Sequence, residues 1–563
     1  MDQINSVSRF GRGSFTFAAA LRVDQVRFSA PSGQWLARPV FEHQPAQFRY
    51  DHHGYEELIA AGEMVTMARF TPTEEGVYRF QALRAGNVLE EGQFTCLPSQ
   101  HPGYVQVSAV DPRYFATTNG ESYCAIGVNL CGVPTYPLPR GMEHFEVGSQ
   151  NASLGLHEYR RWFRLLADNG GNFTRIWLSN TYFQTEADQA GQTDPLKFNR
   201  LDGLIELARE YGIRLKLCFD HFRAFRSENP VTKAHFMRTY IDPTSGREAA
   251  SMDEWLNDAH WRDLWFQKAQ AYLARYGGDP VVMAWELWNE MDCIEGSWEP
   301  VREWTRTMLA RIKAQEPNQL VVQSLGSYDE THKQRVQDDL RDMPEMDFQQ
   351  VHRYLDQGAP WEICTLDPVA FSIQSVQATR RPDRPILLAE TGAVNDRHTG
   401  PFRYYRMDNR GIIFHDTTFP AFFAGAGGSG HNWFWDSYVD QKNLWGQLKP
   451  FADLLKGVAL DQEGFEILNI SNADAWCLAL KGKHTLLAWV RSRADSWHAV
   501  LRDEIQPPLY LQLTFNLDLP GRPRSARIAS FWPAEEPEVA LAVEKNQLLV
   551  KNLKYGAMIR IEY

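Results

Sequence analysis

The sequence predicts an α/β protein in which a (β/α)₈ (TIM) barrel is flanked by an N-terminal and a C-terminal β-sandwich domain. Between about residues 110 and 460, short apolar runs alternate with amphipathic helical segments, which is the pattern of βα units around a parallel sheet. On either side, short apolar runs are separated by Gly, Pro, Asp and Asn turns and show almost no helical periodicity. We therefore expect domains at residues 1–108, 109–459 and 460–563.

Helices in the central region end at glycine just before the next strand. Tyr159, Trp162, Phe163 and Leu166 stand at i, i+3, i+4 and i+7, and this helix stops at Gly170. An open doubly wound sheet is the structural alternative, but it usually has fewer parallel strands and a Gly-rich phosphate loop, which this sequence lacks. The eight predicted strands are Tyr123–Asn129, Asn172–Leu178, Ile213–Asp220, Val281–Trp288, Gln319–Leu325, Asp347–Tyr354, Pro385–Glu390 and, with the weakest pattern, Ala426–Trp435.

The composition, 44% hydrophobic and 23% charged, is typical of a globular protein. The formal net charge of −12 argues against a nucleic-acid partner, whose phosphates require a basic face. No apolar run approaches the roughly 20 residues that cross a bilayer, so we expect no membrane segment. The N-terminus, MDQINSVSRFGRG, lacks the charged and apolar regions of a signal peptide, which indicates a cytoplasmic protein or a secreted one whose signal has been removed.

The seven cysteines are odd in number, scattered, and without metal-binding spacing, so we expect free thiols. Acidic and histidine residues near the strand ends, such as Asp220, His221, Asp292 and His352, also come from different strands without ligand spacing. The sequence therefore predicts neither a metal nor a cofactor. The connections 130–155 and 221–260 are long for a barrel, which favours a pocket or a partly blocked cleft on that face. An extended groove lined by Trp255, Trp261 and Trp361 is the alternative.

Two glutamates stand at the ends of strands on opposite sides of the predicted barrel. The fourth strand delivers Asn289-Glu290 and the seventh delivers Glu390. Barrel enzymes place their chemistry at these C-terminal strand ends. Hydrolysis of a glycosidic bond needs one carboxyl group to protonate the leaving oxygen and a second one beside the anomeric carbon. Either glutamate alone is explained by a solvated surface position, whereas the pair is the arrangement that this reaction requires.

Around these glutamates the sequence resembles clan A glycoside hydrolases, whose acid/base and nucleophile lie on strands four and seven, and within that clan it is most similar to the family 5 cellulases and mannanases. The resemblance covers about residues 125–440. It implies that Glu290 is the acid/base and Glu390 the nucleophile of a retaining enzyme. The substrate-binding residues that it implies are Arg175 (NFTRIW), His221 (FDH), Asn289, His352 and Tyr354 (VHRY), and Trp433 (GHNWFWD) as a platform for the sugar. The N-terminal sandwich, which leads into the barrel through HPGYVQVSAVDPRYF, resembles the immunoglobulin-like domain that precedes some cellulase-like barrels.

The residue types agree with these roles. Arg175 can keep Glu390 ionised, because a charge-assisted contact lowers the pKa of a carboxylate. Tyr354 can donate its hydroxyl to the same group. Glu290 must begin protonated, and the neighbouring rings of Trp285 and Trp288 can raise its pKa by desolvation.

Several candidate residues keep a second interpretation. His221 is either a substrate ligand or a histidine hydrogen-bonded inside the rim. Trp433 and Trp435 point the same way on a strand, so one is a platform and the other packing, and the pattern does not decide which. Glu286 points the same way as Glu290 but lies a layer deeper, which favours a supporting role.

We therefore expect a retaining β-glycoside hydrolase that acts by double displacement on β-linked glucosides, mannosides or related oligosaccharides and polysaccharides. A transglycosylase with the same covalent intermediate is one alternative, and a non-catalytic carbohydrate-binding barrel is another. The sugar, the linkage, the choice between exo and endo action and the oligomeric state stay open. An aldolase is disfavoured, because no lysine occupies the end of strand four, six or seven.

Overall fold

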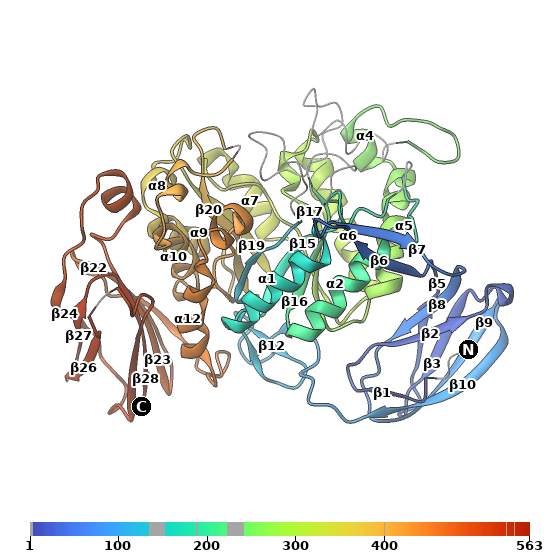
Figure 1. The fold of residues 1–563 in the computed structure, drawn as a ribbon, viewed down its shortest axis with the longest axis horizontal. Coiled ribbons are helices and arrows are strands. Elements are labelled where there is room, and N and C mark those ends of the chain that lie inside the picture. The colour runs from blue at the N-terminus through green and yellow to red at the C-terminus, as the bar shows by residue number, and fades with distance from the viewer. Residues whose placement is uncertain are drawn as a thin grey trace.

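The computed structural model describes residues 4–133, 153–186, 190–221, 241–398, 400–535, 537–544 and 546–563. A central helical and β-stranded body lies between two all-β regions, one at each end of the molecule (Figure 1). The predicted long connections at 130–155 and 221–260 fall largely outside the described residues. Among the helices that the structure describes, none is long and apolar enough to cross a membrane.

The central body is built on eight parallel segments. Five of them form one parallel sheet in chain order, a sixth and seventh form a parallel pair, and an irregular eighth segment joins the two. The strands are β14 (Gly127–Asn129), β15 (Phe173–Trp177), β16 (Arg214–His221), β17 (Val282–Asn289), β18 (Leu320–Val322), β19 (Gln349–Asp356) and β20 (Ile386–Val394). Backbone bonds from Asp347 to Val321 and from Tyr328 to His352 link the β18 and β19 sides and close the barrel.

The eighth segment differs from the predicted strand Ala426–Trp435. It pairs only through the parallel bridges Gly428 with Ala125 and Asn432 with Thr391, and the chain then turns into a short π-helix, Trp435–Asp440. The reason is the local sequence AGAGGSG, since a Cβ atom at Gly428 would lie 2.3 Å from the Ala125 carbonyl oxygen. The glycines allow the backbones to approach closely at this point, and a regular β-strand does not form.

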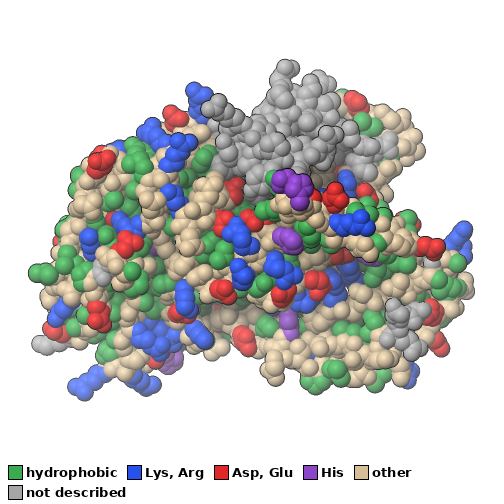
Figure 2. All heavy atoms as spheres, in the orientation of Figure 1, with side chains coloured by type: hydrophobic (Ala, Val, Ile, Leu, Met, Phe, Trp, Pro, Cys, Tyr) green, Lys and Arg blue, Asp and Glu red, His purple; other side chains and the backbone are tan. Residues whose placement is uncertain are grey.

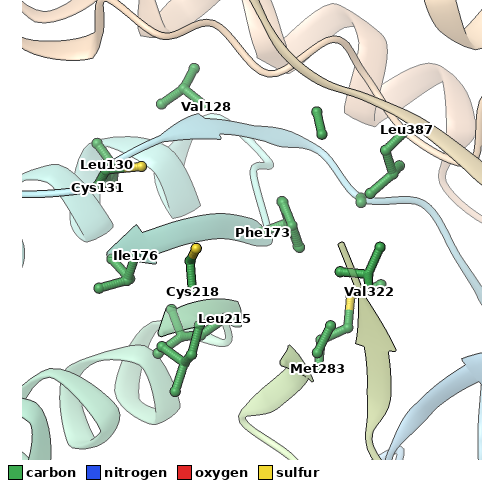
Figure 3. Packing of buried hydrophobic residues seen from close by; sticks show 14 of the residues in the cluster. Val128, Leu130, Cys131, Phe173, Ile176, Leu215, Cys218, Met283, Val322 and Leu387 are labelled. Carbon is green, nitrogen blue, oxygen red and sulfur yellow. The ribbon is translucent and has the colours of Figure 1, made fainter. Parts of the chain in front are cut away.

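Helices cover the outside of this barrel (Figure 1). In α1 the buried residues are Tyr159, Trp162, Phe163 and Leu166, which is the face that the spacing predicts. The helices are α1 (Leu156–Asp168), α2 (Phe198–Tyr211), α4 (Met252–Asn257), α5 (Ala259–Tyr276), α6 (Trp298–Gln315), α7 (Gln334–Arg341), α8 (Glu362–Leu366), α9 (Pro368–Thr379), α10 (Ile412–Thr418), α11 (Pro420–Phe423) and α12 (Leu448–Leu455). Inside, apolar side chains of several barrel strands pack together, among them Phe173, Leu215, Met283, Val322 and Leu387 (Figure 3).

The N-terminal region contains two sheets, β1-β10-β9-β3-β4 and β2-β8-β5, whose facing side chains share one apolar core. Phe28 illustrates this packing, because it stacks on Phe70 of the other sheet at 4.1 Å. The strands are β1 (Ser6–Ser8), β2 (Gly13–Phe17), β3 (Gln25–Ser29), β4 (Trp35–Pro39), β5 (Phe41–His43), β6 (Ala46–Tyr50), β7 (Glu56–Ala60), β8 (Val65–Phe70), β9 (Gly76–Arg84) and β10 (Asn87–Leu97). A small sheet of β11 (Val105–Val107), β12 (Phe115–Thr117) and β13 (Ser122–Tyr123) then leads into the barrel.

The C-terminal region likewise has a five-stranded sheet, β21-β22-β23-β28-β25, and a three-stranded sheet, β24-β27-β26, around a shared core. It docks on the barrel through Arg491 of β23, which is fully buried and pairs with Asp416 of α10 at 2.7 Å. The strands are β21 (Glu466–Asn469), β22 (Ala475–Lys481), β23 (Thr485–Ser492), β24 (Tyr510–Asn516), β25 (Ser525–Ser530), β26 (Ala540–Glu544), β27 (Gln547–Leu553) and β28 (Gly556–Glu562). On the face drawn in Figure 2, acidic and basic side chains are interspersed over all of these regions.

The hairpin β6–β7 joins the N-terminal region to the rim of the barrel. Glu56, whose side chain is fully buried, accepts hydrogen bonds from the Leu156 backbone N–H at 2.9 Å and from the Tyr182 hydroxyl at 2.8 Å. It also pairs with Arg200 at 3.0 Å. One carboxylate therefore caps the start of α1 and ties two barrel elements to the N-terminal sheets.

We predict that Glu56→Ala lowers the free energy of unfolding by about 2–4 kcal/mol, because it leaves a buried hydroxyl, an N–H and a guanidinium without their acceptor. The matched control is Glu57→Ala, since Glu57 is the exposed neighbour on the same strand. It should change stability by less than about 0.5 kcal/mol. Urea denaturation followed by tryptophan fluorescence measures both variants, and equal midpoints would contradict the docking role of Glu56.

Candidate active site

Glu290 lies at the C-terminal end of β17, directly after Asn289. Its backbone is left-handed, with a φ of 55°, and its N–H donates to the Ser324 hydroxyl at 3.0 Å. Left-handed backbone is unfavourable for a residue with a side chain and concentrates at functional sites. The side chain is nevertheless only 10% exposed, so the strand end presents a carboxyl group inside the rim.

Glu390 lies on β20, opposite Glu290, and each of its oxygens has its own donor. The guanidinium of Arg175 binds Oε2 at 2.6 Å, and the hydroxyl of Tyr354 donates to Oε1 at 2.5 Å. Arg175 comes from β15 and Tyr354 from β19, so three strands fix the position of this carboxylate. Both predicted contacts to Glu390 are present.

The two glutamates face each other across His352 of β19. Its Nδ1 lies 2.9 Å from Glu290 Oε1 and 3.5 Å from Glu390 Oε2. One oxygen of each carboxyl group and a ring nitrogen of His352 all lie within 4.8 Å of one another. Burial lowers the pKa of His352 to about 4, so the imidazole is neutral near pH 7 and adds no charge between the carboxyl groups.

Arg175 also connects Glu390 to a deeper layer. Its Nε and one terminal nitrogen bind the two oxygens of Glu286 at 2.7 Å each, and that same terminal nitrogen donates to Asn289 Oδ1 at 2.7 Å. Lys216 lies 3.4 Å from Glu286. Although burial opposes it, the charges of Arg175 and Lys216 hold the pKa of Glu286 at about 2. Glu286 is therefore the fixed anion that orients Arg175, in agreement with the supporting role expected from its depth.

Two buried donors of the site are left without a partner within the described part of the chain. They are the side-chain nitrogen Nδ2 of Asn289 and the ring nitrogen Nε2 of His352. Because Asn289 Oδ1 is engaged by Arg175, the orientation of its amide is set and Nδ2 is the free end. Unpaired buried donors are costly unless a ligand uses them.

The pKa values of the two glutamates are set by different surroundings. Burial raises the pKa of Glu290 to about 7, and the charge of Asp292 raises it further. Burial also raises the pKa of Glu390 above its ordinary value, although the charge of Arg175 opposes this. Arg175 therefore lowers the pKa of Glu390, as the sequence predicts, but the desolvation of the buried carboxylate outweighs this contact.

The sequence pointed to the rings of Trp285 and Trp288 as the cause of the raised Glu290 pKa. In the structure, Trp285 packs on a ring of the neighbouring strand β16, and Trp288 packs on rings of the outer helices. Trp285 stacks on Phe219 at 5.1 Å, and Trp288 packs edge-on against Trp255 of α4 and Trp304 of α6. The physical cause, burial, is the expected one, but these two rings have their main contacts elsewhere.

Aromatic side chains line the other side of the site. Trp177 stacks on His221 at 4.2 Å and lies 4.7 Å from Trp433. His221 Nδ1 is hydrogen-bonded to the Ser179 hydroxyl at 2.6 Å. Trp433 is partly exposed, whereas Trp435 is buried and packs edge-on against Trp162. The planes of the two rings are perpendicular, and Trp435 begins the π-helix, so the strand that would point both side chains the same way ends before it.

Three residues near the site were not among the sequence candidates: Trp177, Lys216 and His398. The sequence could have indicated Trp177 and Lys216, because each is a large or charged residue in a predicted barrel strand close to the candidate Arg175. His398 had none, since it lies in the loop after β20 and pairs with Asp356 at 2.8 Å only through the fold.

Two groups of side chains have the donor types of a metal site. They are Glu290, His352 and Glu390, and a second group of Asp329, Asp356 and His398. In each group a side-chain cation already binds one carboxylate, Arg175 at 2.6 Å from Glu390 and Lys333 at 2.9 Å from Asp329. The absence of a metal and of a cofactor stays a prediction.

Comparison with known proteins identifies the central region. Residues 137–409 match the profile of the cellulase family, glycosyl hydrolase family 5. Mannan endo-1,4-beta-mannosidase 7 of Arabidopsis thaliana is 27% identical over 286 residues, which cover 46% of this chain and 60% of that protein. Mannan endo-1,4-beta-mannosidase F of Aspergillus clavatus is 29% identical over 272 residues, covering 44% of this chain and 57% of that protein. The chain thus spans less than two thirds of the length of these curated relatives.

A similar fold extends over the whole chain. The crystal structure of a candidate glycoside hydrolase from Bacteroides vulgatus superposes with a TM-score of 0.59 at 13% identity, covering 99% of this chain and 100% of that one. At this identity the likeness concerns the fold alone, including both flanking regions. The profile match and the two mannosidase relatives show that the central region of this chain is similar to the enzymes of glycosyl hydrolase family 5.

Proposed function

We propose that the protein is a retaining β-glycoside hydrolase, with Glu390 as nucleophile and Glu290 as acid/base. The observation that carries this proposal is the approach of the two carboxyl groups, whose nearest oxygens lie within 4.8 Å across His352. Retaining glycosidases hold their carboxyl groups about 5–5.5 Å apart, whereas inverting enzymes leave about 6.5–9.5 Å for a water molecule. The short separation supports direct attack by Glu390.

In the first step, an oxygen of ionised Glu390 attacks the anomeric carbon and the bond to the leaving oxygen breaks. The proton of Glu290 goes to that oxygen, so an alcohol departs and a glycosyl ester of Glu390 remains. In the second step, the Glu290 carboxylate takes a proton from water as the water oxygen attacks the same carbon. The Glu390 carboxylate leaves, and both glutamates return to their starting protonation states.

The surroundings of the site fit these two steps. Arg175 and Tyr354 hold Glu390 from two sides and stabilise it as the attacking and departing carboxylate. The unpaired Nδ2 of Asn289, next to Glu290, is placed to donate to a sugar hydroxyl beside the anomeric carbon. His352 is neutral and supplies a second donor or acceptor at its unpaired Nε2.

Trp433 is the side chain that best suits the sugar platform. It is the partly exposed ring of the pair and continues the aromatic surface of Trp177 and His221. Trp435 is buried against Trp162 and fits the packing role. His221, fixed by Ser179 and stacked on Trp177, belongs to the same wall and binds substrate from its edge.

The substrate that we favour is a β-linked mannoside or a β-mannan. The two relatives described above are named as mannan endo-1,4-beta-mannosidases, and the similarity of their sequences to this chain supports a mannoside substrate. Transglycosylation would use the same intermediate with a sugar acceptor in place of water. A non-catalytic barrel is disfavoured, because Arg175, Tyr354, Glu290 and Glu390 are all present and in mutual contact through the network described. We assign residues 109–459 to the catalytic barrel, with sandwich domains at 1–108 and 460–563.

We predict that Glu390→Ala abolishes hydrolysis of all β-glycosides, with a loss of at least about 10³-fold, because no other group forms the covalent bond. Glu290→Ala should lose about 10²–10⁴-fold on substrates with poor leaving groups and much less on activated aryl glycosides, which need no proton. Azide should partly restore the Glu290 variant. Initial rates on both substrate types measure this, with Glu299→Ala on the exposed face of α6 as the matched control. Wild-type rates in Glu390→Ala would refute the assignment.

The pH dependence should be bell-shaped. Activity is lost as the pH rises through about 7, because Glu290 then loses the proton it must donate. It is lost on the acid side as Glu390 becomes protonated, above the ordinary value of 4.5. The profile of kcat/KM on an aryl β-mannoside measures both limbs.

The control for this profile is Glu290→Gln on a substrate with a strongly activated leaving group. This variant should retain the acid limb and lose the alkaline one. An alkaline limb that persists in Glu290→Gln would show that another group titrates there.

A further inference from the structure

His398 is a histidine beside the site that the two steps above do not use. It lies in the loop after β20, with a left-handed φ of 55°, and its side chain is 40% exposed. The loop is held by the bridge between Val394 and Pro401 and by a bond from the His398 N–H to the Asn395 carbonyl at 2.9 Å. Residues with a side chain are uncommon in this backbone region, but histidine tolerates it better than most.

The orientation of the ring is fixed by Asp356, the last residue of β19. Its Oδ2 lies 2.8 Å from His398 Nδ1, while its Oδ1 accepts the N–H of Gly358 at 2.8 Å. Asp356 is buried, with a side chain 5% exposed. A buried carboxylate that accepts from Nδ1 fixes the tautomer and favours the charged imidazolium.

The same ring contacts the nucleophile side of the site. It packs edge-on against Tyr354, with ring centroids 5.5 Å apart and an angle of 87°. Tyr354 in turn donates its hydroxyl to Glu390. The imidazole is therefore held between Asp356 and the tyrosine that positions the nucleophile.

His398 also acts on the acid/base through its charge. Its positive charge lowers the pKa of Glu290, and the charge of Glu290 in return raises the pKa of His398. Burial opposes the charged imidazolium, but the hydrogen bond that His398 donates to Asp356 and the nearby carboxylates raise the pKa of His398 overall. Such coupling is reciprocal by necessity.

Other charged groups surround the pair. Asp329 has a carboxylate oxygen within 4.8 Å of both Asp356 and His398, and Lys333 neutralises it at 2.9 Å. Asp292 raises the pKa of Glu290, and Lys333 lowers it. His398 differs from Asp292 and Lys333 in that its ring also packs against Tyr354, which in turn binds Glu390.

We propose that His398, held by Asp356 against Tyr354, is a positioning residue that stabilises the ionised form of Glu290. That form arises when Glu290 gives its proton to the leaving group, and it is the base in the second step. No proton passes to His398 itself. The inference rests on the proposed function of Glu290 and adds a residue that tunes it.

The test compares His398→Asn with His398→Lys in the alkaline limb of kcat/KM. Asparagine tolerates the left-handed backbone and carries no charge, so the limb should move up by at least about 0.5 pH unit. Lysine keeps a positive charge, so the limb should stay at the wild-type position or below it. The matched control is His332→Asn. His332 is an exposed histidine between β18 and β19 that pairs with Glu330, and its replacement should leave the pH profile unchanged.

Equal shifts of the alkaline limb in the asparagine and lysine variants would mean that position 398 matters only for the structure of the loop. An unmoved limb in His398→Asn would mean that the charge of His398 does not affect the pKa of Glu290. Either result overturns the inference while leaving the proposed function intact. If the wild type cleaves no β-glycoside, the proposed function fails. Whether His398 affects the ionisation of Glu290 is then decided by a measurement that needs no turnover. The carboxyl carbon of Glu290 is then titrated by ¹³C NMR in Glu390→Gln protein, where adding His398→Asn should raise its pKa and an unchanged value contradicts the proposal.

Discussion

The buried guanidinium of Arg175 is the interaction on which the rest of the site depends. It makes four hydrogen bonds, two to Glu286, one to Asn289 and one to Glu390, and so links β15, β17 and β20 across the barrel. Charges this deeply buried are tolerated only when they are fully paired. Removing any partner would leave an uncompensated charge, so the position of Glu390 is tied to the integrity of the barrel.

Charge balance within this network explains why two glutamates in one cavity behave differently. Arg175 and Lys216 are the buried cations, and Glu286 and Glu390 are the carboxylates that contact Arg175 directly. Glu290 has neutral His352 as its neighbour and, within the described part of the chain, no ion pair with a lysine or an arginine. Burial therefore raises its pKa to about 7. The proton shared by the pair therefore resides on Glu290, which is the condition for one group to attack and the other to donate.

The sequence was informative where chemistry follows from strand position. Glu290 directly follows β17, and Glu390 lies within β20, which continues to Val394 beyond the predicted strand end. Both positions could be predicted because these strands have clear apolar runs, and Arg175 lies in another such run. Features that depend on contacts between distant segments were not accessible in this way. The eighth segment is irregular because glycine lets backbones approach, and the pKa of Glu390 is raised because burial exceeds the effect of one contact. His398 has no periodic signal at all, since only the fold brings it to Asp356.

The central claim is that Glu390 forms a covalent bond to the sugar, and trapping of that intermediate tests it most directly. A 2-deoxy-2-fluoro-β-mannosyl fluoride slows both steps but has a leaving group that needs no proton, so the glycosyl-enzyme should accumulate. Mass spectrometry of the protease-digested protein should then show one fluoromannosyl group on the peptide that contains Glu390. A modification on the peptide that contains Glu290 in place of Glu390, or turnover of this substrate to an inverted product with no adduct, would contradict the account.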